Sequence, residues 1–310
     1  MATAMWSAPA MAEYPERAVT IVVPYAPGGQ FDLHGRLIAD ELSKKLGQPF
    51  VVENKPGAAT MIGAQYVSKA EPDGYTLLMG GATMFTILPH EYNSLPYKVE
   101  DLVGITMLQE LPVAIVLNPK AVPARTLPEF IDYAKANPGI KFATTGRGNS
   151  GHLMLELLAK EVGISLEAVH YSGSGPARQD LLAGNVALIM EGPSTSVANI
   201  QDGLIVGLGI AGAERVSALP DFPTFSELGY PQLNVPSWSA MVAPAGTPDD
   251  VIDKLNSALN EILNDPAIRE RLVRDVTSPI PGTREEFAAR VSRDSEIWKG
   301  VIEQLGIKLD

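Results

Sequence analysis

The feature that most constrains the fold is a repeated order of an apolar strand-like run, a small-residue loop and a helix. In the first copy, the β-branched run Ala18–Pro24 is broken by Pro27–Gly29 and followed by a helical pattern over Phe31–Leu46. Strands that alternate with helices of this length predict an α/β fold with mostly parallel sheets covered on both sides. The same order recurs along the chain, with further strands expected at residues 50–53, 75–79, 113–117, 141–145, 167–171 and 187–190. Further helices are expected at residues 57–69, 127–136 and 152–161, and another is opened by the loop at residues 172–176 and runs through residue 182.

Length and charge narrow the class of protein. The chain has 310 residues, which is enough for two domains. Its 24 basic and 36 acidic side chains give a net charge of −12. That balance argues against a nucleic-acid partner, because phosphate binding needs a basic face, and against an anionic membrane surface. The sequence has no cysteine, so we expect no disulfide, thiolate metal site, cysteine nucleophile or lipid anchor on cysteine.

The N-terminal residues 1–13 have the composition of a processed leader. Ala10–Ala12 supplies an A-x-A cleavage pattern, but the positive start and a full apolar stretch are missing. We therefore expect the remnant of a secretory signal peptide, with a disordered extension as the alternative. No other apolar run approaches the ~18 residues of a membrane span.

Five small-residue loops follow predicted strands. In open parallel sheets such loops gather at the carboxyl edge, where ligands bind. Three of them lead directly into helices, whose free N–H groups and positive dipole end favour a carboxylate or phosphate. The alternative is a purely structural role, in which the glycines only end the strands. The loops are Pro27–Gln30, Gly80–Thr83, Gly146–Ser150, Ser172–Pro176 and Gly192–Ser196.

The loop Gly146–Gly151 formally matches the dinucleotide pattern G-x-G-x-x-G between a strand and a helix. That pattern requires an acidic residue at the end of the next strand to bind the ribose hydroxyls, whereas Glu167 lies at the start of that strand. We therefore favour an anion-binding loop and keep an NAD-dependent oxidoreductase as the alternative. Other enzyme motifs fail on spacing: His152 replaces the last glycine of a nucleophile elbow, the four histidines lack metal-ligand spacing, and no P-loop is present.

Three polar residues stand out beside these loops. Asp32 either complements the helix dipole or orients the first loop near a ligand. His152, at a helix start, either donates to a bound carboxylate or caps the helix. Glu191, at the end of an apolar strand, either receives a ligand ammonium or hydroxyl or a donor from the opposite domain, or repels a second ligand carboxylate and so limits ligand choice.

Seven blocks in this order resemble the periplasmic substrate-binding receptors of tripartite tricarboxylate transporters, the TctC or Bug family. The likeness runs from Tyr14 to the C-terminus. Each block alone is weak, but seven in register are specific. The blocks are YPER at 14–17, VPYAPGG at 23–29 with Asp32, LGQP at 46–49 with VENKPGA at 52–58, PDGYTLL at 72–78, GHL at 151–153, LPDFPT at 219–224 and APAGTP at 243–248.

The resemblance implies a two-domain periplasmic-binding-protein fold, in which two α/β domains close on a small carboxylate like a Venus flytrap. It assigns residues 14–110 plus 238–310 to the first domain and residues 111–237 to the second. Phe31 and Met84 are placed near the ligand, although core packing explains each equally well. The expected ligand-binding residues are Pro27, Gly28, Gly29, Gln30, Phe31, Asp32, Thr83, Met84, Thr144, Thr145, Gly146, Arg147, Asn149, Ser150, His152, Ser172, Gly173, Ser174 and Glu191.

The function that the resemblance implies is non-catalytic. We expect a monomeric periplasmic receptor, without cofactor or metal, that binds a dicarboxylate, aromatic, amino or hydroxy carboxylate and delivers it to integral-membrane transporter subunits. This sequence departs from the family at Glu191, where aspartate is more usual, and at Arg147 within the glycine loop. Both departures leave the distal ligand group open. An effector domain of a transcription factor is a third hypothesis, but it needs a basic helix-turn-helix ahead of Ala18.

Overall fold

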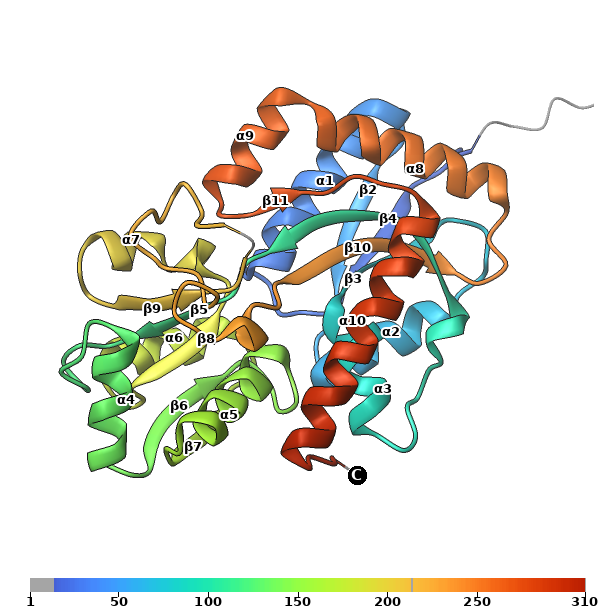
Figure 1. Cartoon of the computed structure of the whole chain (residues 1–310). Coiled ribbons are helices and arrows are strands. Elements are labelled where there is room, and N and C mark those ends of the chain that lie inside the picture. The colour runs from blue at the N-terminus through green and yellow to red at the C-terminus, as the bar shows by residue number, and fades with distance from the viewer. Residues whose placement is uncertain (1–13, 213, 310) are drawn as a thin grey trace, which may run out of the picture.

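The computed structural model describes residues 14–212 and 214–309, so the predicted signal-peptide remnant at residues 1–13 lies outside the described residues. Two separate sheets with flanking helices make up the described part (Figure 1). The strands are β1 Val19–Val23, β2 Phe50–Asn54, β3 Thr76–Gly81, β4 Leu102–Leu111, β5 Ala114–Leu117, β6 Ile140–Thr144, β7 Leu166–His170, β8 Leu188–Glu191, β9 Val206–Ile210, β10 Ser237–Pro244 and β11 Ser278–Pro279.

The helices flank both sheets. None of those in residues 14–212 and 214–309 has the length and apolar character that a membrane crossing requires. Their bounds are α1 Gln30–Leu46, α2 Met61–Ser68, α3 Leu88–Glu91, α4 Leu127–Ala136, α5 Ser150–Val162, α6 Ser174–Ala183, α7 Val197–Gln201, α8 Asp249–Asn264, α9 Pro266–Arg274 and α10 Arg284–Leu305.

Both sheets are mixed rather than mostly parallel. Among the described strands, the first sheet has the order β11-β4-β10-β3-β1-β2 and the second the order β7-β6-β8-β5-β9. The parallel pairs are β1 with β2 and β3, and β6 with β7 and β8. β10 runs antiparallel to β3 and β4, and β5 runs antiparallel to β8 and β9. The α/β two-sheet class is confirmed; the antiparallel strands enter because β4 leads into the second sheet and β10 brings the chain back.

Strand β1 explains how the first sheet is buried on both faces. Because side chains alternate along a strand, Ile21 and Val23 pack into the cluster that includes α1 and α8. Val22 packs on the opposite face, into the cluster that includes α2 and the start of α10. The run is therefore apolar throughout, as the sequence predicts for a strand covered on both sides.

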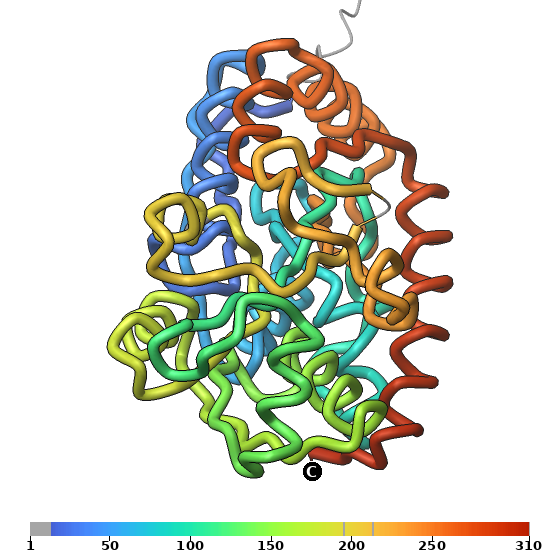
Figure 2. Tube along the Cα trace, turned by 60° about the vertical axis from the view of Figure 1, so that its left-hand side comes forward, coloured from blue at the N-terminus to red at the C-terminus, as the bar shows by residue number. Residues whose placement is uncertain are grey.

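Helix α10 joins the two sheets. It runs along one side of the molecule past the first sheet and ends beside the second (Figures 1 and 2). Near its start, Phe287 packs edge-on against Trp238 of β10, with ring centroids 6.0 Å apart. Further along, Trp298 and Ile302 belong to the core of the second sheet together with Leu153 of α5. We keep residues 14–110 plus 238–310 and residues 111–237 as the proposed domains, with α10 packed on both.

The main local departure lies after β2. The expected helix at residues 57–69 begins only at Met61. Ala58, Ala59 and Thr60 instead take positive φ angles of 45°, 50° and 84°, which is a strained conformation for residues with a Cβ. β4, β9 and β10 were also not predicted, since their pairing partners lie far away in the sequence.

Candidate functional site

The first loop leads into helix α1 without a side-chain cap. Its N-cap is Gly29, and no side chain accepts a hydrogen bond from the first turn. The free N–H groups of that turn are therefore directed at whatever lies beyond the end of β1. Pro27 and Gly28 are exposed, whereas Gly29 and Gln30 are half-buried.

Asp32 holds the first loop in place. Its Oδ2 accepts the Gly28 N–H at 2.9 Å, and its Oδ1 accepts Asn54 Nδ2 of β2 at 2.9 Å and pairs with Arg36 Nη2 at 2.9 Å. Burial raises the pKa of the carboxyl, but these hydrogen bonds outweigh burial and lower the pKa overall. Asp32 thus anchors the backbone of the first loop, while contact of this loop with a ligand stays a prediction.

Phe31 lies over the end of β3. Its ring stacks on Tyr25 with centroids 4.1 Å apart. A Cβ added to Gly81 would come within 2.7 Å of the Phe31 ring and 3.1 Å of the Tyr25 hydroxyl. Only glycine at position 81 therefore lets this aromatic pair close over the strand end.

Thr83 and Met84 follow β3 in a short helical turn, Thr83–Ile87. Thr83 is nearly buried. Met84 is fully buried and packs into the core on the α2 face of the first sheet, while its carbonyl accepts the Tyr97 hydroxyl at 2.7 Å. The structure thus favours the core-packing interpretation for the Met84 side chain.

The loop after β6 is held by its own side chains. Asn149 caps α5 by accepting the His152 N–H at 2.9 Å, and its Nδ2 donates to Thr145 Oγ1 at 2.7 Å. Thr144 Oγ1 lies 2.8 Å from His170 Nδ1 and 3.2 Å from the Gly146 carbonyl. The N-terminus of α5 is therefore already capped, unlike that of α1.

His152 is turned into the fold. Its Nδ1 accepts the Gly148 N–H at 3.1 Å, so the neutral ring carries its proton on Nε2, 3.8 Å from Glu156 Oε1. Burial, with smaller contributions from His170 and Arg147, lowers the pKa of His152 to about 4. The ring is thus neutral at pH 7 and supports the loop backbone. Donation of its side chain to a ligand carboxylate stays a prediction.

Helix α6 also begins without a side-chain cap. Its N-cap is Gly173, with no side-chain cap bond. Ser172 is exposed, and Ser174 is half-buried. Of the α-helices that begin at the predicted ligand loops, α1 after β1 and α6 after β7 thus start without a side-chain cap.

Glu191, the last residue of β8, is paired within its own sheet. Arg178 of α6 donates to it twice, from Nε to Oε1 at 3.3 Å and from Nη2 to Oε2 at 3.2 Å. Ser196 Oγ adds a hydrogen bond of 2.7 Å. The Glu191 side chain is 2% exposed, so this carboxylate is compensated by Arg178 rather than by a donor from the other domain.

The loops of the two sheets face each other directly. A Cβ at Gly192, after β8, would lie 2.4 Å from Gln30 Oε1 at the start of α1. A Cβ at Gly148 would lie 2.3 Å from Glu91 Oε2 at the end of α3. Residues distant in sequence therefore meet at the carboxyl edges of β1, β3, β6 and β8.

Buried polar atoms without a hydrogen-bond partner gather at the same edges. Within the described residues these include Gln30 Nε2, beside Gly192, and Ser194 Oγ, two residues after Gly192 in the chain. Thr60 Oγ1, after β2, and Ser239 Oγ, paired in register with Gly81, are also unpartnered. Buried polar groups are normally satisfied, so these atoms indicate a site where hydrogen bonds to a ligand or to water complete the fold.

Sequence reasoning named only Gln30 among these four. Ser194 lies within a predicted loop, so its signal was present but not used. Thr60 and Ser239 lie on a strained turn and on an unpredicted strand. Only the packing of the sheets shows that their hydroxyls lack partners.

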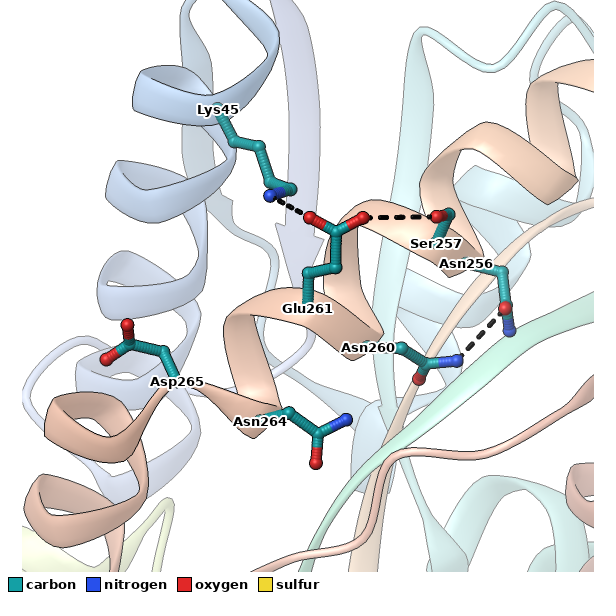
Figure 3. A pocket seen from close by; sticks show the side chains of 7 residues that line it. All are labelled: Lys45, Asn256, Ser257, Asn260, Glu261, Asn264 and Asp265. Atoms are coloured by element: carbon teal, nitrogen blue, oxygen red, sulfur yellow. Dashed lines mark hydrogen bonds and ion pairs between the residues drawn. The ribbon is translucent and has the colours of Figure 1, made fainter.

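A separate depression of about 630 Å³ lies between α1 and α8 (Figure 3). Its polar groups satisfy one another: Lys45 pairs with Glu261, and Asn260 Nδ2 donates to Asn256 Oδ1 at 3.0 Å. None of its lining residues belongs to the loops described above, so this depression is not part of the candidate site.

Comparison with known proteins identifies the family. The family described as tripartite tricarboxylate transporter family receptor, TctC, matches residues 35–307. The chain belongs to the TctC family. Protein BugT of Bordetella pertussis is similar, with 36% identity over 317 residues that span 100% of this chain and 96% of BugT. The chain is therefore a periplasmic solute-binding receptor of the TctC/Bug family.

Two solved TctC-like structures contain ligands. The R. palustris protein Rpa4515 with adipate is 30% identical, with a TM-score of 0.91 over 96% of this chain and 99% of that one. MatC from Rhodopseudomonas palustris with bound malate is 31% identical, with a TM-score of 0.86 over 93% of this chain and 100% of that one. These similarities confirm the two-domain periplasmic-binding-protein fold.

Membership of a receptor family weighs against the oxidoreductase alternative. The structure also places Glu167 opposite Lys141, near the start of β7, where it cannot reach a ribose at the other end of the strand. Gly151 serves packing instead: its Cβ would lie 2.4 Å from the Met190 carbonyl of β8.

Proposed function

We propose that this TctC receptor captures a small dicarboxylate between the loops of its two sheets and delivers it to a cognate membrane transporter. The observation that carries the proposal is the set of unpartnered buried donors, Gln30 Nε2 and Ser194 Oγ above all, on facing loops. They lie beside the uncapped start of α1, and α6 begins uncapped at the same edge of the second sheet.

The donors are neutral, and this suits a protein with a net charge of −12. An amide, hydroxyls and helix N–H groups can hold a carboxylate by local hydrogen bonds without a basic surface. Glu191 does not oppose this, because Arg178 compensates its charge. Arg147, exposed in the loop after β6, supplies positive charge for a second carboxylate.

The choice of a dicarboxylate draws on the relatives that hold adipate and malate. Aromatic, amino and hydroxy monocarboxylates remain in the expected ligand class. Their affinities, measured beside those of the dicarboxylates, decide which ligand is preferred. Binding between the two sheets would bring their loops together by hinge motion. The protein would act as a monomer without covalent chemistry.

A thermal-shift titration tests the proposal. Ligand that binds only the folded state stabilises by about 2.7 kcal/mol at one hundred times Kd, which raises Tm by several degrees. We expect adipate or malate to raise Tm and the uncharged adipamide, matched in length to adipate, to have no effect. Stabilisation by NAD but by no carboxylate would overturn the proposal and favour the oxidoreductase.

A further inference from the structure

Glu91 is a fully buried carboxyl group at the contact between the two sheets. It ends α3, which follows β3 of the first sheet, and its side chain is 0% exposed. Neither Oε1 nor Oε2 has a hydrogen-bond partner among the described residues. The carboxyl faces the Cα of Gly148 in the loop after β6, and the Glu91 carbonyl accepts the Leu309 N–H at 3.1 Å.

A carboxylate in this position has lost its water and gained no donor in return. Burying an ion without a partner is far costlier than burying the neutral acid. The contact between α3 and the loop Gly146–Gly151 is therefore compatible with the protonated acid. Gly148, with φ +75°, permits the close approach because it has no side chain.

We propose that Glu91 makes packing of the Gly146–Gly151 loop against α3 depend on a bound proton. With the proton present, the neutral side chain fills the contact. When the proton dissociates, hydration of the Glu91 carboxylate is favoured over its burial. The contact between α3 and the Gly146–Gly151 loop then loosens. The loop carries Arg147 and Asn149, which are among the expected ligand-binding residues. An effect of loop packing on ligand affinity therefore rests on the proposed function.

Three groups around this contact have shifted pKa values, and of these only Glu91 is shifted upward. Burial raises the pKa of Glu91 to about 8, and the Arg147 charge opposes this rise. His152, on the other side of Gly148, has its pKa lowered to about 4, and His90 of α3 has a pKa lowered by burial. The remaining charged groups on this side, which act on His90 rather than on Glu91, are Glu296, Lys299, Glu303 and Lys308.

The sign of the effect follows from the raised pKa. The folded state holds the proton more tightly than the unfolded state, whose ordinary value is 4.5. The stabilising contribution is full below pH 4.5 and is lost as pH rises to about 8. Within that window the folding equilibrium of the wild type falls by up to about tenfold per pH unit relative to a variant without the titrating group.

The test compares thermal unfolding of the ligand-free protein from pH 6 to pH 9. We expect Glu91→Gln, which keeps the shape and cannot ionise, to gain Tm relative to the wild type as pH rises. Glu100→Gln, which removes a charge from an exposed turn, is the control and should follow the wild-type curve. Parallel curves for the wild type and Glu91→Gln would overturn the proposal.

A second variant reads the same group without altering it. Because the Arg147 charge lowers the pKa of Glu91, Arg147→Gln should move the midpoint of the wild-type pH dependence to higher pH. A midpoint that stays in place or moves down contradicts the proposal, even if Glu91→Gln does not fold.

Calorimetry with adipate as the probe then tests the link to ligand capture. We expect the wild type to bind adipate more weakly at pH 8.5 than at pH 6.5, and Glu91→Gln to lose most of that difference. If both proteins show the same pH dependence, the link between Glu91 and the ligand is wrong. If adipate, malate and other carboxylates all fail to bind, the proposed function fails, while the stability curves still decide the role of Glu91.

Discussion

Arg178 of α6 clamps Glu191 of β8 through two hydrogen bonds, with donor–acceptor distances of 3.3 and 3.2 Å. The pair joins the helix that begins at one ligand loop to the strand that ends at another. It also removes the negative charge that Glu191 would otherwise present beside an anionic ligand. The pair thus compensates a buried carboxylate between α6 and β8.

Arg178→Met should destabilise the protein by about 3–5 kcal/mol at pH 7, because it leaves the carboxylate of Glu191 buried and unpaired. Glu191→Gln in the same background should recover much of that loss by removing the charge. Urea unfolding of both single variants and the double variant measures the coupling. Additive losses would mean that the pair contributes nothing specific.

Removing the Glu191 charge also addresses ligand choice. Since Arg178 already compensates this carboxylate, Glu191→Gln alone should leave the order of affinities among dicarboxylates, hydroxy acids and amino acids unchanged. A calorimetric series with malate, adipate and aspartate checks this. A selective loss of aspartate binding would instead assign Glu191 to a ligand ammonium.

Asp32→Asn should weaken carboxylate binding by about tenfold, equivalent to ~1.4 kcal/mol, because the new amide cannot accept from both Gly28 and Asn54. Asp40→Asn is the matched control, since Asp40 lies on the same helix in an exposed ion pair with Lys44. The pKa of Asp32 is lowered in the folded state, so its stabilising contribution is present above its ordinary value of 3.8 and is lost on acidification. The stability difference from the wild type should therefore shrink below about pH 4.

Ser194→Ala and Gln30→Ala should each reduce carboxylate affinity by about threefold to tenfold, the worth of roughly one hydrogen bond, with little change in Tm. Little stability is lost because Gln30 Nε2 and Ser194 Oγ have no hydrogen-bond partner among residues 14–212 and 214–309. The exposed Gln201→Ala serves as control. Unchanged affinity in both variants would place the ligand elsewhere.

His152 should remain neutral until strongly acidic pH, with its proton on Nε2. Two-dimensional imidazole NMR should give a midpoint of about 4 and a hydrogen-bonded Nδ1. Because the pKa is lowered from 6.5, the folded state loses stability as pH falls from 6.5 toward 4. Titration near 6.5 would show that the His152 ring is not buried as the structure places it.

Local signals in the sequence predicted much of the fold. Gly47 ends α1 in the left-handed conformation that favours glycine, and the pattern Thr283-x-x-Glu286 forms the capping box of α10. Such features depend on residues within one turn of one another, so they can be predicted from a short stretch of sequence. The order of the loops along the chain is also a local feature of the sequence. The sequence therefore predicts the first loop and singles out Asp32 beside it.

Contacts between segments that are distant in the sequence could not be predicted from it. β4 and β10 pair with each other across more than a hundred residues, and α10 packs on both sheets, because compact folding rather than local preference brings these segments together. The arginine opposite Glu191 stands thirteen residues away on another element. No local pattern predicts such a partner.

The sequence by itself determined the α/β class, the loops that carry the candidate site and the family resemblance, since each rests on short runs of residues. Only the tertiary structure decided which polar groups in those loops are already satisfied. Asn149, His152 and Glu191 have partners within the fold, whereas Gln30, Thr60 and Ser194 retain unpartnered buried atoms. Hydrogen-bond satisfaction depends on the neighbours that sheet crossovers bring together, and a buried group without a partner, such as Glu91, becomes visible only once the chain has closed around it.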